Sequence, residues 1–374
     1  MNFDLSEERT LLKDSITRFV RDNYELETRI KNSQSDTGFS ADYWKTIAEL
    51  GWLALPFSEE EGGIGGNQID TMLIMEEFGK GMVLEPYFAS IVLGAGALRR
   101  GAPEKMQKAM FEGIIDGSKQ LALAYAETQA RFDLHNVVTS AKQEGDQFVL
   151  NGTKCVVQNA ETASHIVVSA RSSGGQIDTN GITLFLIDAN SDGVELLNYP
   201  TVDGLRASEV TLKNVKVSKE AIIGELDAGF GILQAVANDA ILALAAEAIG
   251  TMEVLYTDTI EYTKQRVQFD QALSEFQVLQ HRMVDMFVEY EQCKSLLFRA
   301  TLEVTDNSEG AQRSVHALKH LIGKAGTFIA ENAVQLHGGM GMTEELRIGH
   351  LFKRLAVIDM QFGNSDYHLE KFAA

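Results

Sequence analysis

The sequence predicts an α+β protein in three parts: an N-terminal helical domain (residues 1–120), a small middle β-barrel or sandwich domain (121–227) and a C-terminal antiparallel four-helix bundle (228–374). Apolar residues recur at helical spacing in the first and last parts. Short strand-like runs, separated by Gly, Asn, Asp and Ser, fill the middle part. The 374 residues include only 4 prolines, which suits long helices.

The N-terminal domain opens with a helix-start signal between Asp4 and Glu8, where Ser6 can accept a hydrogen bond from a first-turn amide. A loop rich in acids and glycine over 58–66 precedes a second helix. The apolar residues at helical spacing in these two helices are Leu11, Leu12, Ile16, Phe19, Val20, Met72, Met75 and Phe78.

The middle domain contains a dipeptide typical of tight turns, Asn151-Gly152, because both residue types tolerate positive φ angles. It lies between the apolar runs Phe148–Leu150 and Cys155–Val157, so we expect a β-hairpin there. Further strands are expected at His165–Ser169, Gly181–Asp188, Val194–Leu197 and Glu209–Val217.

The C-terminal part has the pattern of an antiparallel bundle, with long helices and short links. Two of its helices are expected over Gln277–Val304 and Ala311–Leu336. An earlier helix has an apolar face formed by Ile241, Leu244, Ala245, Ala248, Met252 and Leu255.

Composition excludes several classes of function. With 33 basic and 53 acidic residues the formal net charge is −20, which argues against general binding to nucleic acid or anionic membranes. The cysteines, Cys155 and Cys293, lack the spacing of a metal site or a disulfide framework. No apolar stretch reaches membrane-spanning length, since the run Ile241–Ile249 is short. The acidic N-terminus is unlike a signal peptide, so we expect a cytoplasmic protein.

Two local motifs carry the strongest functional signal. The first is Arg266-Val267-Gln268-Phe269, which continues to Leu273, Phe276 and Gln277. Its arginine can offer a planar fork of donors to a pyrophosphate. The second runs from Gln335 to Gly341 and contains two adjacent glycines, which let backbone amides approach a flat or anionic ligand closely.

These motifs resemble the arginine–phenylalanine–glutamine signature and the QxxGGxG stretch of the acyl-CoA dehydrogenase family, and weaker matches extend the resemblance over the whole chain. It is closest to the small subunits of heteromeric enzymes of the pimeloyl-CoA and steroid side-chain types. The resemblance implies FAD as cofactor, bound across a subunit interface, an acyl-CoA substrate, and electron-transfer flavoprotein as electron acceptor. The implied FAD contacts are Arg266, Gln268, Phe269, Leu273, Phe276, Gln277, Gln335, Gly338 and Gly339.

The sequence departs from the family where the catalytic base should lie. The resemblance places the usual glutamate at Phe362, before Gly363, and the alternative base position at Ala240, followed by Ile241 instead of arginine. Neither phenylalanine nor alanine can accept a proton.

The β-domain shows parallel departures. The threonine and serine of the family's TEPxAGSD stretch are replaced by Ala126 and Phe132. The tryptophan–isoleucine–threonine that the family places over the isoalloxazine resembles Val156-Val157-Gln158 here. A stacking indole and a small hydroxyl donor are therefore both missing.

This asymmetry predicts a mixed assembly. A partner of the same fold would supply the glutamate, the cleft and the isoalloxazine site. This chain would supply Arg266, Gln335, Gly338 and Gly339 to the partner's flavin.

Several alternatives remain open. In a homomeric enzyme Glu247, two turns beyond Ala240, could be a relocated base, because apolar surroundings raise a carboxyl pKa; it could equally be a solvated or ion-paired acid. Asp366 is a second candidate base, and His337 could contact flavin or be structural. The chain could also be a non-catalytic structural subunit, or perform an elimination that needs no α-proton abstraction.

Overall fold

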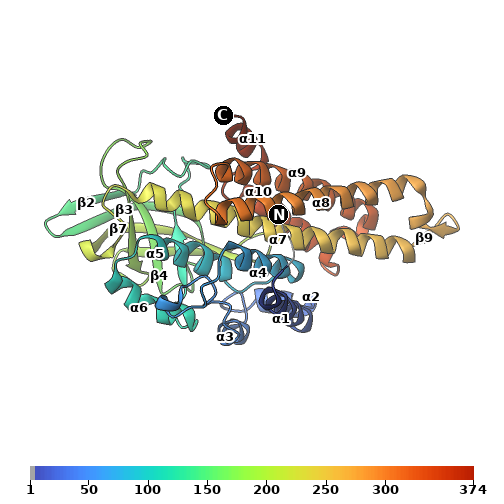
Figure 1. The fold of residues 1–374 in the computed structure, drawn as a ribbon, viewed down its shortest axis with the longest axis horizontal. Coiled ribbons are helices and arrows are strands. Elements are labelled where there is room, and N and C mark those ends of the chain that lie inside the picture. The colour runs from blue at the N-terminus through green and yellow to red at the C-terminus, as the bar shows by residue number, and fades with distance from the viewer. Residues whose placement is uncertain (1–4) are drawn as a thin grey trace. The chain divides into compact units, whose positions relative to one another are not determined.

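The structure, a computed structural model, describes residues 5–374. Asp4 lies outside the described residues. The predicted α+β class is confirmed: helices form both ends of the chain and strands its middle (Figure 1). The predicted bundle helices are α8 (Gln277–Thr305) and α9 (Ala311–His337).

The chain forms two compact units that do not follow the order of the sequence. The helical unit combines residues up to Asn32 with Asn67–Val83 and Ile241–Ala374, and the sheet unit combines Ser33–Gly66 with Leu84–Ala240. The division into three parts at residues 120 and 227 stays a prediction.

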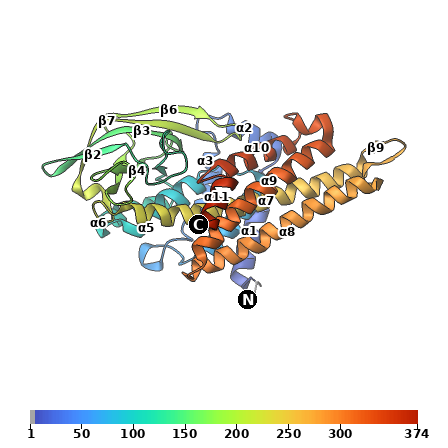
Figure 2. The ribbon, with the colours of Figure 1, turned by 90° about the horizontal axis from the view of Figure 1, so that it is seen from above.

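Long helices dominate the helical unit. Between α7 and α8 lies a small hairpin, at the free end of both helices in Figures 1 and 2. The elements wholly or largely in this unit are α1 (Glu7–Asn23), α2 (Leu26–Ser33), α4 (Gln68–Gly81), α7 (Gly229–Gln265), β9 (Val267–Gln268), β10 (Gln271–Ala272), α8, α9, α10 (Arg347–Met360) and α11 (Ser365–Ala373).

Local chemistry explains how α1 starts and where it packs. As predicted, the Ser6 side chain caps the helix, accepting from the Arg9 amide at 3.3 Å. The Arg9 guanidinium donates to both carboxylate oxygens of Asp70 on α4, at 2.9 and 3.2 Å. Asp70 also accepts from the Asn67 amide, so one carboxylate caps α4 and joins it to α1.

The sheet unit contains one eight-stranded sheet in the order β6-β7-β3-β2-β4-β5-β8, with β1 paired in parallel to β4. The strands are β1 (Leu121–Ala124), β2 (Ser140–Glu144), β3 (Gln147–Gln158), β4 (His165–Arg171), β5 (Ile182–Asp188), β6 (Val194–Pro200), β7 (Arg206–Ser218) and β8 (Ile222–Ile223). Its helices are α3 (Ala41–Glu49), the buried π-helix η2 (Phe88–Ala95), α5 (Gly96–Gly101) and α6 (Glu104–Ile115).

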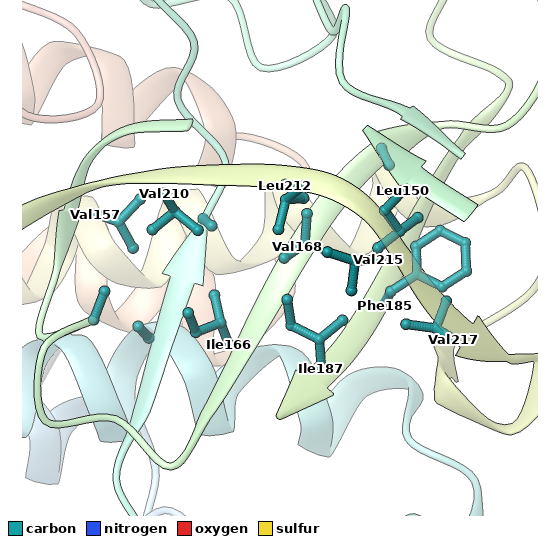
Figure 3. Close-up of a cluster of buried hydrophobic side chains, with 14 of the residues drawn as sticks. Leu150, Val157, Ile166, Val168, Phe185, Ile187, Val210, Leu212, Val215 and Val217 are labelled. Carbon is teal, nitrogen blue, oxygen red and sulfur yellow. The ribbon is translucent and has the colours of Figure 1, made fainter. Parts of the chain in front are cut away.

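The core of the sheet unit explains why its strands form. Apolar side chains from β3, β4, β5 and β7 point toward one another in Figure 3. The rings of Phe148 and Phe185 lie 5.3 Å apart, and Val168, Leu212 and Val215 are fully or almost fully buried beside them. Branched and aromatic residues of this kind favour the pleated backbone.

The predicted hairpin at Asn151-Gly152 is wrong. Strand β3 continues through both residues, with a bulge between Leu150 and Gly152, and the β2–β3 turn lies earlier, at Gly145 (φ +63°). The reason for glycine at position 152 is space: a Cβ there would come within 2.6 Å of the Cα atom of Thr139. Close backbone approach, not a turn, requires this glycine.

The apolar character of α7 also differs from the sequence-based expectation. The helix has 37 residues and an 18-residue window of mean hydropathy 1.5, so by length and composition it could cross a membrane. The prediction that no stretch reaches spanning length is therefore wrong. However, 72% of that window is buried inside the protein, as is usual for a core helix, and such a single helix is weak evidence for a membrane span.

Candidate functional site

The two predicted motifs meet in the helical unit around one hollow of about 590 Å³. The end of α7, the turn after β10 and the end of α9 form its walls. The residues that line the hollow are Tyr262, Arg266, Gln268, Leu273, Gln335, Leu336, His337, Gly338, Gly339 and Met340. Segments about 70 residues apart in sequence therefore form one site.

Arg266 is positioned by the end of α7 and by the hairpin that follows. Its amide donates to the Tyr262 carbonyl, and its own carbonyl accepts from the Leu273 amide, both at 2.9 Å. The hairpin turns at Phe269 and Asp270, whose φ angles of 55° and 64° are those of a primed turn. Among residues 5–374 the Arg266 guanidinium makes no ion pair, so its donors are available to a ligand.

The two glycines open the opposite wall. Gly338, with φ 60° and ψ −142°, ends α9 in a conformation that side chains disfavour. A Cβ atom added at Gly338 or at Gly339 would meet nothing within 4 Å. The backbone of this wall is therefore accessible from the hollow, as an anion-binding site requires.

His337 and Tyr262 form a flat pair at the same site. Their rings stack with centroids 4.3 Å apart and an interplanar angle of 26°. The Nδ1 atom of His337 lies 2.8 Å from the Ala333 carbonyl, so it carries the proton and leaves Nε2 as an acceptor. Burial lowers the pKa of His337, which keeps the ring neutral. Sequence reasoning missed Tyr262, although its place one helical turn before Arg266 puts it on the same face.

Three of the proposed contact residues lie outside the lining of this hollow. Phe269 is at the hairpin tip and is 87% exposed. Its ring meets that of Phe276 edge-on, at 6.3 Å. Gln277 is the exposed first residue of α8. Phe269, Phe276 and Gln277 therefore lie outside the walls of the hollow, on the surface of the helical unit.

The two positions at which the resemblance places the family's base carry no acid. Phe362 is buried with a left-handed φ of 56°, and Ala240 is fully buried within α7. Glu247 is buried in the helical unit and forms a bidentate ion pair with Arg354, at 2.5 and 2.6 Å. Both of its carboxylate oxygens are therefore engaged.

Part of the segment expected to line the flavin, Val156-Val157-Gln158, lies at a bulge in β3. Val156 is 55% exposed and has a φ of 52°, which is strained for a β-branched residue. Nearby, the buried Glu127 accepts from Lys154 at 2.7 Å and from the amides of Val138 and Thr139. Burial alone would raise the pKa of Glu127, but attraction to Lys154 and these hydrogen bonds lower it to about 2. The buried pair of Glu127 and Lys154 therefore lies near Val156, where the resemblance expects an aromatic side chain.

Family comparison identifies the chain. Models of the acyl-CoA dehydrogenase N-terminal, middle and C-terminal domains match residues 6–118, 122–215 and 227–374. The chain belongs to the acyl-CoA dehydrogenase family. It is thus an oxidoreductase of the FAD-dependent dehydrogenase class, and the resemblance drawn from the motifs is confirmed.

Relatives match this acyl-CoA dehydrogenase over nearly its full length. The 3-(aryl)acrylate reductase of Clostridium sporogenes (strain ATCC 15579) is 29% identical over 359 residues, covering 94% of each chain. The probable acyl-CoA dehydrogenase YngJ of Bacillus subtilis (strain 168) is 26% identical and covers 98% of this chain and 97% of its own.

Solved structures share the fold and include flavin complexes. PigA with FAD and proline has a TM-score of 0.92 and 26% identity, covering 100% of this chain and 98% of its own. The Tcur3481-Tcur3483 steroid ACAD variant has a TM-score of 0.88 and 25% identity, covering 98% and 97%. FAD is the cofactor of the family, as predicted. The unpaired guanidinium and open glycine backbone of the hollow suit the ADP half of this molecule.

Proposed function

We propose that this chain is one subunit of a heteromeric acyl-CoA dehydrogenase and donates half of an FAD site to a partner of the same fold. The observation that carries the proposal is an asymmetry. Arg266, Gly338 and Gly339 line an open hollow, whereas Phe362 and Ala240 stand where the family resemblance places the proton acceptor. The Tcur3481-Tcur3483 enzyme, which is named for two proteins, supports a mixed assembly.

The chemistry divides between the two subunits. When bound, FAD supplies the hydride acceptor for α,β-dehydrogenation of an acyl-CoA thioester. Arg266 neutralises the pyrophosphate, and the amides after Gly338 donate to it. The partner contributes the carboxylate that removes the α-proton. Electron-transfer flavoprotein is the proposed final electron acceptor.

A homomeric enzyme with Glu247 as base receives little support from the structure. A general base needs a lone pair that can reach the substrate. Both Glu247 oxygens accept hydrogen bonds from the Arg354 guanidinium in the interior of the helical unit. The ion-paired alternative for this acid describes the observed contact.

FAD affinity of the assembled complex tests the proposal. The full chain is co-expressed with a candidate partner of the same family that retains the glutamate base, and the FAD dissociation constant is measured for wild type, Arg266→Ala and Gly339→Val. Loss of charged hydrogen bonds predicts a roughly tenfold to hundredfold weaker affinity for Arg266→Ala. A Cβ atom at Gly339 would meet nothing within 4 Å, so Gly339→Val adds bulk at the wall of the hollow and should also weaken binding.

Two matched controls separate contact from general damage. Arg18→Ala removes another exposed arginine, and Gly231→Val adds a side chain at a second glycine with open space around it. Both should bind FAD as wild type does. Unchanged affinity in Arg266→Ala and Gly339→Val would favour a purely structural subunit. Full flavin occupancy and acyl-CoA oxidation by this chain alone would refute the mixed assembly.

A further inference from the structure

A buried histidine, His368, and a half-buried one, His316, form a hydrogen-bonded pair in the helical unit. The Nδ1 atoms of His316 on α9 and His368 on α11 are 2.9 Å apart. His368 Nε2 lies 2.9 Å from the Phe362 carbonyl, and His316 Nε2 lies 3.1 Å from the side-chain nitrogen of Gln312. This series of hydrogen bonds thus ends on the carbonyl of Phe362, which stands at the position expected for the family's base.

The carbonyl at one end fixes the proton on each ring. A carbonyl only accepts, so His368 Nε2 carries hydrogen and its Nδ1 is a lone pair. His316 must then donate from Nδ1 to that lone pair. This leaves His316 Nε2 to accept from the Gln312 amide. Both imidazoles are neutral, and His316 is in the less common Nδ1–H tautomer.

The same loop is held by a buried lysine. Lys319 on α9 donates to the carbonyls of Asp359 and Gly363, at 2.8 and 2.6 Å. Between them Phe362 has a φ of 56°, and a Cβ at Gly363 would lie 2.6 Å from a His368 ring nitrogen. A left-handed backbone conformation costs free energy in a residue such as phenylalanine unless the surrounding structure stabilises it. Donors from His368 and Lys319 provide that hold.

The hydrogen-bonded pair of His316 and His368 can accept few additional protons without losing its hydrogen bonds. One extra proton requires the Gln312 amide to reverse and present its oxygen. A second would place two N–H groups against each other across 2.9 Å. The other titratable groups that act on the two rings are Lys319, His320, Tyr367 and Lys371, and no carboxylate is among them in the described residues. In the unfolded chain both histidines take protons freely.

We infer that His316 and His368 form a proton-sensitive clamp on the loop of Phe362 and Gly363, closed when both rings are neutral and released in acid. The clamp consists of this chain's own side chains, so it does not depend on the proposed function. Its effect is to keep the Phe362 backbone in a left-handed conformation near neutral pH and to free it below about pH 6.

The sign of the pH effect follows from proton binding. Burial lowers the pKa of His368 to about 3, and burial followed by the charge of Lys371 lowers that of His316. Below the ordinary histidine pKa of about 6.5 the open chain therefore binds more protons than the clamped one. Opening is favoured by up to tenfold per pH unit for each ring that stays neutral. The stabilisation of the closed loop by the neutral histidine pair is constant above that pKa and is lost as the pH falls below it.

Hydrogen exchange of residues 359–368 in the full chain, at pH 7.5 and 5.5 and corrected for intrinsic rates, tests the clamp. We expect protection to fall about tenfold or more in wild type. His316→Asn keeps a donor at the Nδ1 position, and its amide can rotate to accept from a protonated His368. Its protection should change little with pH. His281→Asn, at an exposed histidine of α8, should behave like wild type.

Two further measurements keep the inference open to refutation. His316→Leu removes the donor, so the loop should exchange rapidly at both pH values while circular dichroism confirms the fold. Nitrogen NMR of labelled histidine should show the Nδ1–H tautomer for His316 and the Nε2–H tautomer for His368 at pH 7.5. Identical pH profiles for wild type and His316→Asn, or an Nε2–H tautomer at His316, would overturn the clamp.

Discussion

The ion pair of Glu247 and Arg354 is the clearest case of a single contact that decides between functions. Its partners are 6% and 3% exposed and lie 107 positions apart in the chain. Helical periodicity places Glu247 among apolar residues, which is why the sequence suggests a base with a raised pKa. The arginine comes from another helix, and no local pattern predicts it.

We therefore predict that Glu247→Gln costs stability rather than chemistry. Removing one partner leaves the Arg354 charge buried, at a cost of about 3 to 5 kcal/mol in the free energy of unfolding. Urea denaturation measures it. The double change Glu247→Leu with Arg354→Leu should recover most of the loss. A variant with normal stability but no turnover in the complex would instead identify Glu247 as the base.

The β9–β10 hairpin has its own role at the scale of secondary structure. Its tip places Phe269 in water, 87% exposed, next to the hollow that contains Arg266. A large aromatic side chain gains free energy when a partner covers it. The hairpin is thus a candidate contact for the proposed partner subunit.

Replacing the tip residue tests this role. Phe269→Ser should leave the free energy of unfolding near that of wild type, because the side chain is already exposed. Losing its burial against a partner should weaken subunit association by roughly tenfold. Sedimentation of the co-expressed pair measures the association. Ile177→Ser, at another side chain that is 65% exposed, should have no effect, and equal losses in both variants would count against the hairpin.

Hairpins also show where sequence reasoning succeeds and fails. The Asn151-Gly152 pair has turn chemistry but lies inside β3, since Gly152 serves the close approach of Thr139. The observed primed turn uses Phe269 and Asp270, which carry no glycine signal. Tolerance of positive φ is a local property, whereas the need for it comes from distant parts of the fold.

At the scale of the whole molecule, the family signature predicted that Arg266 and Gln335 would serve one ligand, whereas no sequence pattern predicted the grouping of the helices. Motif order and spacing were enough to bring Arg266 and Gln335 to one site. The two compact units were not predictable, because they depend on contacts between distant segments: Arg9 pairs with Asp70 and joins α1 to α4, and Lys80 pairs with Glu253 at 3.3 Å and joins α4 to α7. Such pairings depend on which apolar faces meet in space.

The flavin content of purified protein tests the assembly as a whole. Purified alone, the chain should hold well under one FAD per protomer, because under the proposed function it provides only the ADP half of a site. Co-purified with its partner, the complex should hold FAD in stoichiometric amount. Absorbance of flavin released on denaturation gives both ratios, and equal ratios in the two preparations would contradict the shared site.

Gly339 has a consequence for how this sequence can drift between species. The fold imposes no demand for glycine there, since an added methyl group would meet nothing within 4 Å. An alanine at this position should be tolerated by folding, and selected against only where the proposed nucleotide must still fit. The presence or loss of glycine at this position in natural homologues should therefore indicate which of them still bind a nucleotide in the hollow.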